Sequence, residues 1–163
     1  MLSTVAHSLR RPLLQSTRLR FPITQTRTYL TLKDYQVTAT ATGTGRNGQV
    51  ESDGFGIDLA TPKELGGTGN GKNPEQLFAM GYASCFLGAT QLMARNQKKP
   101  DQAEAAKVHV SVSLGEPKDI GGFGLAVGIK VEGVDENVLQ AAHEFCPYSR
   151  ALKHGIDISV TRA

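Results

Sequence analysis

The chain has 163 residues, 39% of them hydrophobic, with two cysteines and a formal net charge of +3. This length suffices for one domain with a real hydrophobic core, and two cysteines are too few for a disulfide framework. Residues 1–33 carry six basic side chains and no acidic one, which leaves a net charge of −3 for residues 34–163. Because nucleic-acid binding needs a basic patch on the folded part, this distribution argues against it.

The N-terminal segment differs from the rest of the chain in composition. It is rich in arginine, contains serine and threonine, and lacks acidic residues, which is typical of a mitochondrial transit peptide. Arg27-Thr28-Tyr29 resembles a matrix-protease site, so we expect residues 1–29 to be removed and residues 30–163 to form a single domain. The alternative is a basic tail without a targeting role. No run of about 18 apolar residues occurs, so we expect no membrane span.

The first part of the domain has the alternation of a β-sheet. In residues 35–42, apolar side chains alternate with threonines, which predicts a half-buried strand. Asn47-Gly48 is a strong hairpin signal, and residues 49–61 then fit one or two strands. Residues 61–72 are rich in glycine and are expected to form a loop.

The longest helical pattern covers residues 73–97. Asn73 is suited to the N-cap, Pro74 to the first turn and Gln76 to a capping box. Apolar side chains occur on nearly every side of this helix, which predicts that it is buried. One face carries only small residues, where we expect another element to approach, such as the same helix of a second subunit. These residues are Gly81, Ser84, Cys85 and Gly88.

The rest of the domain continues with strands and helices. We expect, in order, a linker at residues 98–101, strands at 107–114 and 123–131 around a turn region, a helix capped by Asp135 through Phe145, a short helix from Pro147 to Gly155, and a strand at 156–160. Strict alternation in these strands is typical of antiparallel sheets with one packed face. Helices gathered on one side of such sheets give an α+β fold.

Two cofactor sites fit the sequence poorly. Residues 66–73 nearly match a phosphate-binding loop, but Asn73 replaces the Ser/Thr that holds magnesium, and no buried strand precedes the loop. We therefore interpret these residues as a connection. A metal site would lack four ligands at zinc-like spacing. The candidate ligands are Cys85, His143, Glu144 and Cys146.

The two cysteines are the remaining candidates for chemistry. Cys146 precedes Pro147 at a predicted helix start, where the helix dipole favours a thiolate. Cys85 lies about 18 Å from the start of its own helix, so it needs a cation from elsewhere, and Arg46 in the hairpin is the candidate. Glu75 lies about 15 Å from Cys85 along the same helix and could approach the Cys85 of a second subunit. Each residue also fits an inert structural role, but two such thiols in a reducing matrix favour transient redox chemistry.

Several motifs together resemble the organic hydroperoxide resistance (Ohr) family of the OsmC/Ohr superfamily. Residues 73–89 (NPEQLFAMGYASCFLGA) are similar to the first-cysteine motif of that family, and residues 145–152 (FCPYSRAL) to its second. Residues 42–48 (TGTGRNG) resemble its arginine hairpin, and residues 61–67 (TPKELGG) resemble the loop before the helix. The similarity covers about residues 34–163.

The resemblance implies an OsmC/Ohr-like fold, with antiparallel sheets around a long central helix, in an intertwined homodimer with two sites at the interface. It also implies a thiol-dependent peroxidase. Cys85 matches the peroxidatic cysteine, which passes through a sulfenic acid, and Cys146 matches the resolving cysteine, which closes a Cys85–Cys146 disulfide. Arg46 matches an arginine beside the thiolate, and Glu75 matches its carboxylate partner.

The family further implies the substrate and the reductant. The substrates would be alkyl or fatty-acid hydroperoxides, and dihydrolipoyl groups of lipoylated proteins would reduce the disulfide. No metal, flavin or haem is implied. Apolar residues near the first cysteine are candidates for a pocket that prefers bulky hydroperoxides. They are Phe78, Tyr82, Phe86 and Phe145.

Two positions depart from the family pattern. Asn47 stands where an aspartate is usual, which we expect to loosen the hairpin, and Arg150 stands where a small polar residue is usual, which adds charge near Cys146. The long basic N-terminus is extra to the bacterial pattern and fits a eukaryotic, mitochondrial member. The alternative function is that of a non-catalytic thiol redox sensor or a small-ligand-binding OsmC-like protein.

Overall fold

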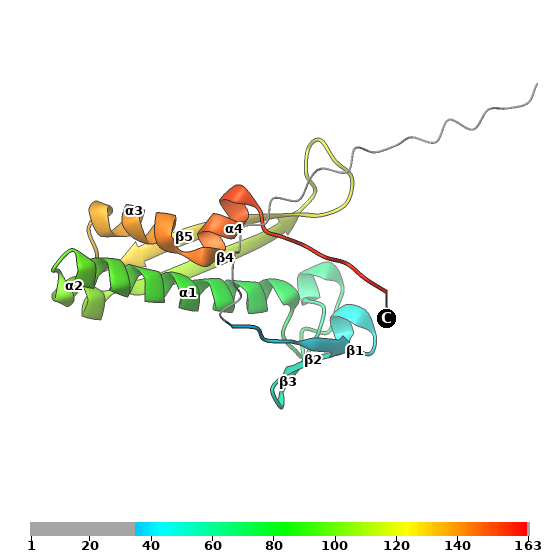
Figure 1. Cartoon of the computed structure of the whole chain (residues 1–163). Helices are drawn as coiled ribbons and strands as arrows, with labels where there is room; N and C mark the ends of the chain where they lie inside the picture. Colours follow the sequence, from blue (N-terminus) through cyan, green and yellow to red (C-terminus); the bar gives the residue numbers. More distant parts are fainter. Residues whose placement is uncertain (1–34, 163) are drawn as a thin grey trace, which may run out of the picture.

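The computed structural model describes residues 35–162, which form two antiparallel sheets and four α-helices (Figure 1). The first sheet has the order β1-β2-β3, with β1 at Thr40–Thr42, β2 at Gln49–Ser52 and β3 at Phe55–Asp58. The second is a ribbon of β4 (Lys107–Gly115) and β5 (Gly124–Glu132). The helices are α1 (Pro74–Asn96), α2 (Pro100–Ala105), α3 (Glu136–Phe145) and α4 (Pro147–His154). Two short 3-10 helices, η1 (Gly45–Asn47) and η2 (Lys63–Leu65), complete the expected α+β architecture.

The long helix α1 begins as the sequence predicts. The Asn73 side chain accepts a hydrogen bond from the Gln76 backbone N–H at 2.8 Å, and the Gln76 side chain accepts one from the Asn73 N–H at 3.0 Å. This capping box satisfies donors that have no partner inside the helix. The backbone of Lys72 also pairs with Asp58 and Ala60, so the start of α1 is fixed against the end of β3.

The main core lies where α1 meets the β4–β5 ribbon and α3. Figure 1 shows the ribbon and α3 lying along α1, while the small sheet sits near the beginning of this helix. Phe86 and Val138 are fully buried, and burial of side chains of this size stabilises the fold by about 1.5–3 kcal/mol each. The core residues are Tyr82, Phe86, Ala89, Ala142 and Cys146 in one cluster, and Ala94, Ala103 and Val138 in another.

The expectation that α1 is buried all round is wrong for the single chain. Met80 is 60% exposed and Leu92 is 39% exposed, because ribbon and helices cover only one side of α1. By length and composition α1 could also cross a membrane, and 28% of its most apolar 18-residue stretch is buried in the structure. The sequence prediction of no membrane span looked for an unbroken run of apolar residues, whereas α1 meets a criterion of average hydropathy. A core helix meets the same criterion, and α1 packs against β4 and α3.

Three segments differ from the sequence prediction. The strand expected over residues 35–42 is limited to β1, and the expected linker at residues 98–101 runs into α2, for which Pro100 is the first residue. No strand forms at residues 156–160, where Val160 is 91% exposed. Within residues 35–162, no strand pairs with this segment, so its β pattern is not used in the single chain.

The other predicted elements are confirmed. Asp135 caps α3 by accepting hydrogen bonds from the N–H groups of Asn137 and Val138, and Pro147 separates α3 from α4. The residues before the glycine-rich loop form η2 and not a buried strand, so the strand–loop–helix arrangement of a nucleotide-binding loop does not form. The predicted cleavage after Tyr29 lies outside the described residues.

Candidate active site

The two cysteines meet at the contact between α1 and the α3–α4 junction. Cys146 ends α3 and begins α4, and it is fully buried. Its Sγ lies 3.7 Å from the Sγ of Cys85, to which it donates a hydrogen bond. A disulfide bond has a length of about 2.05 Å, so the two free thiols are neighbours that can bond after a small approach.

The surroundings of Cys85 act on its protonation in opposite directions. Burial raises the pKa of the Cys85 thiol, and the neighbouring Cys146 raises it further. A hydrogen bond from the backbone N–H of Tyr148 opposes these effects by lowering the pKa. Since burial is the largest effect, the thiol form is favoured in the single chain. A nearby positive charge would be needed to stabilise the thiolate at neutral pH.

The sequence did not predict that the backbone N–H of Tyr148 donates a hydrogen bond to Cys85. Pro147 has no N–H, so Tyr148 provides the first backbone donor of α4. Cys85 lies too far from the start of α1 to benefit from that helix end, but the start of α4 supplies a donor in its place. The Cys146-Pro147 pair was the available indication, because it marks a helix start beside one of the thiols.

The small face of α1 has two different environments. A Cβ atom at Gly81 would lie 3.1 Å from the Tyr148 hydroxyl, whereas one at Gly88 would meet no atom within 4 Å. Glycine at position 81 therefore lets α4 come close to α1. The expected close approach is confirmed at Gly81 with an element of the same chain, and the face around Ser84 and Gly88 is exposed.

Arg46 and Glu75 form a second pair at the start of α1. The Arg46 Nη2 atom donates to Glu75 Oε2 at 2.5 Å, and the two side chains are 40% and 16% exposed. This hydrogen bond is the main cause that lowers the pKa of Glu75. The Asn47 side chain accepts a hydrogen bond from the Thr61 N–H at 2.9 Å. The asparagine oxygen therefore anchors the hairpin to the loop that leads to α1, and since an aspartate could accept the same hydrogen bond, the expected loosening relative to aspartate stays a prediction.

The single chain does not join these two pairs. Glu75 and Cys85 are ten residues apart on one continuous helix, which separates them by about 15 Å along its axis. Arg46 is not among the groups that shift the pKa of Cys85. The structure therefore brings together Cys85 with Cys146, and Arg46 with Glu75, at two separate places.

The four predicted pocket residues fall into two groups. Tyr82 and Phe86 are 2% and 1% exposed, so they belong to the core and offer no surface to a ligand in this chain. Phe78 is half-buried, with ring contacts to Tyr82 and Tyr148 at centroid distances of 6.0 and 6.1 Å. Phe145 is 47% exposed. Only Phe78 and Phe145 remain available to an apolar substrate.

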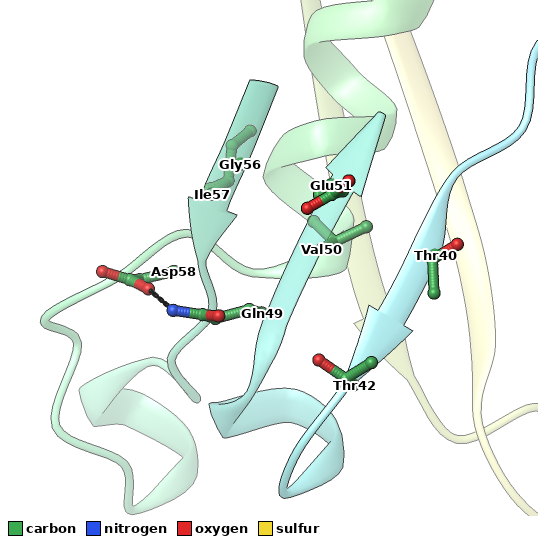
Figure 2. A pocket seen from close by; sticks show the side chains of 8 residues that line it. All are labelled: Thr40, Thr42, Gln49, Val50, Glu51, Gly56, Ile57 and Asp58. Carbon is green, nitrogen blue, oxygen red and sulfur yellow. Dashed lines mark hydrogen bonds between the residues drawn. The ribbon is translucent and has the colours of Figure 1, made fainter. Parts of the chain in front are cut away.

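Two hollows occur among the described residues. Figure 2 shows the larger, of about 480 Å³, on the face of the first sheet, where Gln49 donates to Asp58 at 2.9 Å. A smaller cavity of about 220 Å³ lies between α3 and α4 and includes His143, Ser149 and Arg150. No cysteine lines either hollow. Within residues 35–162, no three His, Cys, Asp or Glu residues gather in a position to hold a metal ion.

Comparison with known proteins gives a consistent result. Residues 67–161 match the family of OsmC-like proteins. The chain is 44% identical over 138 residues to an organic hydroperoxide resistance protein of Xanthomonas axonopodis pv. citri, covering 79% of this chain and 94% of that protein. It is 38% identical to the organic hydroperoxide resistance protein OhrB of Bacillus subtilis, covering 71% of this chain and 89% of the relative.

Solved structures agree with the sequence matches. The crystal structure of Bacillus subtilis OhrB has a TM-score of 0.63 at 38% identity, over 76% of this chain and 94% of that one. An organic hydroperoxide resistance protein from Elizabethkingia anophelis, with thiocyanate bound, has a TM-score of 0.65 at 39% identity, over 76% and 91% of the two chains. These similarities confirm the predicted fold.

Proposed function

Because this chain belongs to the OsmC-like proteins, and within them to the organic hydroperoxide resistance family, we propose that it is a thiol-dependent peroxidase that reduces organic hydroperoxides to alcohols. The observation that carries this proposal is the 3.7 Å separation of the Cys85 and Cys146 sulfur atoms. A pair of free thiols at this distance can be oxidised to a disulfide without rearrangement of the fold.

The reaction requires two steps on the protein. The Cys85 thiolate attacks one oxygen of the hydroperoxide, the O–O bond breaks, and the other oxygen leaves as an alcohol after it takes up a proton. Cys85 is left as a sulfenic acid. The Cys146 sulfur then attacks the Cys85 sulfur, the sulfenic hydroxyl leaves as water with the Cys146 proton, and a disulfide forms. An external dithiol returns both cysteines to thiols by disulfide exchange.

Arg46 and Glu75 would complete this site from a second subunit. We propose a homodimer in which the α1 helices run antiparallel, so that Arg46 of one chain approaches the thiolate of the other. The arginine would stabilise the thiolate and the negative charge that develops on the leaving oxygen, while Glu75 holds the guanidinium in place. Support comes from the exposed side of α1 and from the absence of an Arg46 effect on Cys85 within one chain.

The substrate and the reductant follow from the chemistry and the family. Phe78 and Phe145 offer apolar surface that suits alkyl or fatty-acid hydroperoxides better than hydrogen peroxide. We propose dihydrolipoyl groups on lipoylated proteins as the dithiol reductant, with no metal, flavin or haem. A matrix location would provide such groups, and the arginine-rich residues 1–29 favour it. Failure of these residues to direct import of a reporter protein would contradict that location.

The proposed activity is tested with lipoamide-dependent reduction of tert-butyl hydroperoxide. Wild-type protein should turn over, Cys85→Ser should lose activity completely, and Cys146→Ser should form the Cys85 sulfenic acid but close no disulfide, so that Cys85 is oxidised further to a sulfinic acid and turnover stops. Full activity of Cys85→Ser would refute the mechanism. A wild-type chain that forms the disulfide reversibly without turnover would instead support the redox-sensor alternative.

A further inference from the structure

A chain of three polar side chains leads from the core to the surface next to the thiols. The Tyr82 hydroxyl and the Ser149 Oγ lie 2.8 Å apart, and Ser149 Oγ lies 3.1 Å from His143 Nδ1. Tyr82 and Ser149 are each 2% exposed. Polar groups in such an apolar setting are costly unless they are hydrogen-bonded, so these bonds hold the three residues in a defined arrangement.

Each member of this network lies one helical turn from a thiol. Tyr82 precedes Cys85 by three residues on α1, Ser149 follows Cys146 by three on α4, and His143 precedes Cys146 by three on α3. Residues three apart lie on the same side of a helix. The network therefore spans the same three helices that carry the two sulfur atoms.

The protons of the network have one arrangement that satisfies every group. Within the described residues, the Tyr82 hydroxyl makes only the bond to Ser149. If Tyr82 donates to Ser149, then Ser149 can donate to His143 Nδ1, and the ring carries its proton on Nε2. The opposite direction would leave the buried Tyr82 proton without an acceptor. The network thus runs from the core outward to His143, which lines the 220 Å³ cavity.

Ser149 joins helix α4 to this network. Ser149 is the one buried residue of α4 after Cys146. Tyr148 also contacts α1, because its ring stacks on Tyr82 at 5.4 Å and its hydroxyl approaches Gly81. To form the disulfide, the Cys146 sulfur must move about 1.7 Å closer to Cys85 along a bonding direction. Small errors of position at such a step reduce rates by up to about a hundredfold.

We propose that the Tyr82–Ser149–His143 network is a positioning device for the resolving step, holding Cys146 against Cys85 so that it attacks the sulfenic acid quickly. This inference rests on the proposed peroxidase function. Its consequence is protection of Cys85. A sulfenic acid that waits longer meets a second hydroperoxide, which transfers one oxygen to the sulfur, leaves as an alcohol and produces a sulfinic acid that Cys146 cannot reduce.

The test uses the variant Tyr82→Phe, which removes one hydroxyl and keeps the aromatic ring. It measures peroxide reduction by Cys85 and disulfide closure by Cys146 separately. Stopped-flow measurement of tert-butyl hydroperoxide consumption reports the first step, and acid-quenched intact mass reports disulfide and sulfinic acid. We expect disulfide formation to fall at least about tenfold more than peroxide consumption, with a larger sulfinic fraction per turnover. Equal changes in both steps, or no change in either, would overturn the proposal.

Ser149 provides a matched pair of variants. Threonine at position 149 keeps the hydroxyl, whereas valine has the same shape without it. Ser149→Thr should keep a faster resolving step than Ser149→Val, and Tyr82→Phe combined with Ser149→Val should be no slower than Ser149→Val alone, because both remove the same bond. Equal rates for Thr and Val would show that the hydroxyl has no positioning role.

A separate oxidant distinguishes this inference from the proposed function. Diamide takes two electrons and two protons from the thiol pair and closes the same disulfide without a hydroperoxide. If the wild type fails to consume hydroperoxide, the peroxidase proposal fails, but Tyr82→Phe should still slow disulfide closure by diamide. Unchanged closure in that assay would refute the positioning role in its own right.

Discussion

The thiol region and the Arg46–Glu75 region are built in different ways. Cys146 is fully buried, and it meets Cys85 where three helices of one chain pack together. Arg46 lies on a hairpin and Glu75 in the first turn of α1, ten residues before Cys85, with side chains 40% and 16% exposed. The first region is a packed core element, and the second is an ion pair near the surface.

On the basis of this difference we propose that one chain holds two half-sites. Within residues 35–162, no cation is among the groups that shift the pKa of Cys85, and burial raises that pKa. The ion pair has a cation but no thiol. About 15 Å of helix separates Glu75 from Cys85, and in the proposed antiparallel homodimer the arginine of one chain would reach the thiol of the other.

The largest expected effect is that of Arg46→Ala on turnover. Loss of the charge beside the thiolate should reduce kcat/KM by about a hundredfold or more, as for removal of other groups that stabilise developing negative charge. The free energy of unfolding should change by less than about 1 kcal/mol, because the pair is near the surface. Steady-state peroxidase assays and urea denaturation measure the two quantities. An unchanged kcat/KM would reduce Arg46 to a surface residue.

Mixed dimers test whether the half-sites combine between chains. Arg46→Ala and Cys85→Ser homodimers should each be inactive, but subunit exchange should restore about a quarter of the wild-type rate. Random exchange makes about half of the dimers hybrid, and each hybrid would hold one complete site of its two. If Arg46 served the Cys85 of its own chain, every hybrid site would be defective and no activity would return. Re-mixing each variant with itself is the control.

The pH dependence of Cys85 reactivity should show whether the arginine of the Arg46–Glu75 region acts on the thiolate. Its reactivity should rise with pH, because only the thiolate is nucleophilic and burial raises the pKa of the thiol. If the partner's arginine acts on the thiolate, Arg46→Ala should move the midpoint to higher pH. The rate of alkylation by iodoacetamide against pH measures this midpoint in the Cys146→Ser background. Equal midpoints with and without Arg46 would argue against charge stabilisation.

The sequence was informative where short-range rules decide the structure. The capping box of Asn73 and Gln76, the Asp135 cap and the Pro147 break were all predictable, because each depends on neighbours in the chain. The hydroperoxide resistance motifs also indicated the cysteine pair. The strand expected at residues 156–160 and the fully buried α1 were wrong for the single chain, since periodicity reports which side chains favour burial and not what covers them.

The polar contacts of the site were harder to predict. Ser149 and Tyr82 are 67 positions apart, and nothing in their local patterns indicates that they bond. The donor from Tyr148 to Cys85 likewise joins two helices. Tyr82 and Phe86 were assigned to a substrate pocket because they are apolar residues near a reactive cysteine, but which face of α1 meets the ribbon is decided by packing.

The smallest expected effect concerns the stability that the ion pair provides. Arg46 lowers the pKa of Glu75, so the folded state binds a proton at this carboxylate less readily than the unfolded chain does. The ion pair therefore stabilises the fold fully at pH values above the ordinary glutamate pKa of 4.5. This stabilisation is lost as the pH falls through the lower pKa that Glu75 has in the folded state. Glu75→Gln should reduce the free energy of unfolding by up to about 1 kcal/mol at pH 7 and by less at pH 3.

Glu64→Gln, at an exposed position of η2, is the matched control and should show no such pH-dependent difference. An equal loss for Glu75→Gln at both pH values would mean that the carboxylate charge does not stabilise the hairpin.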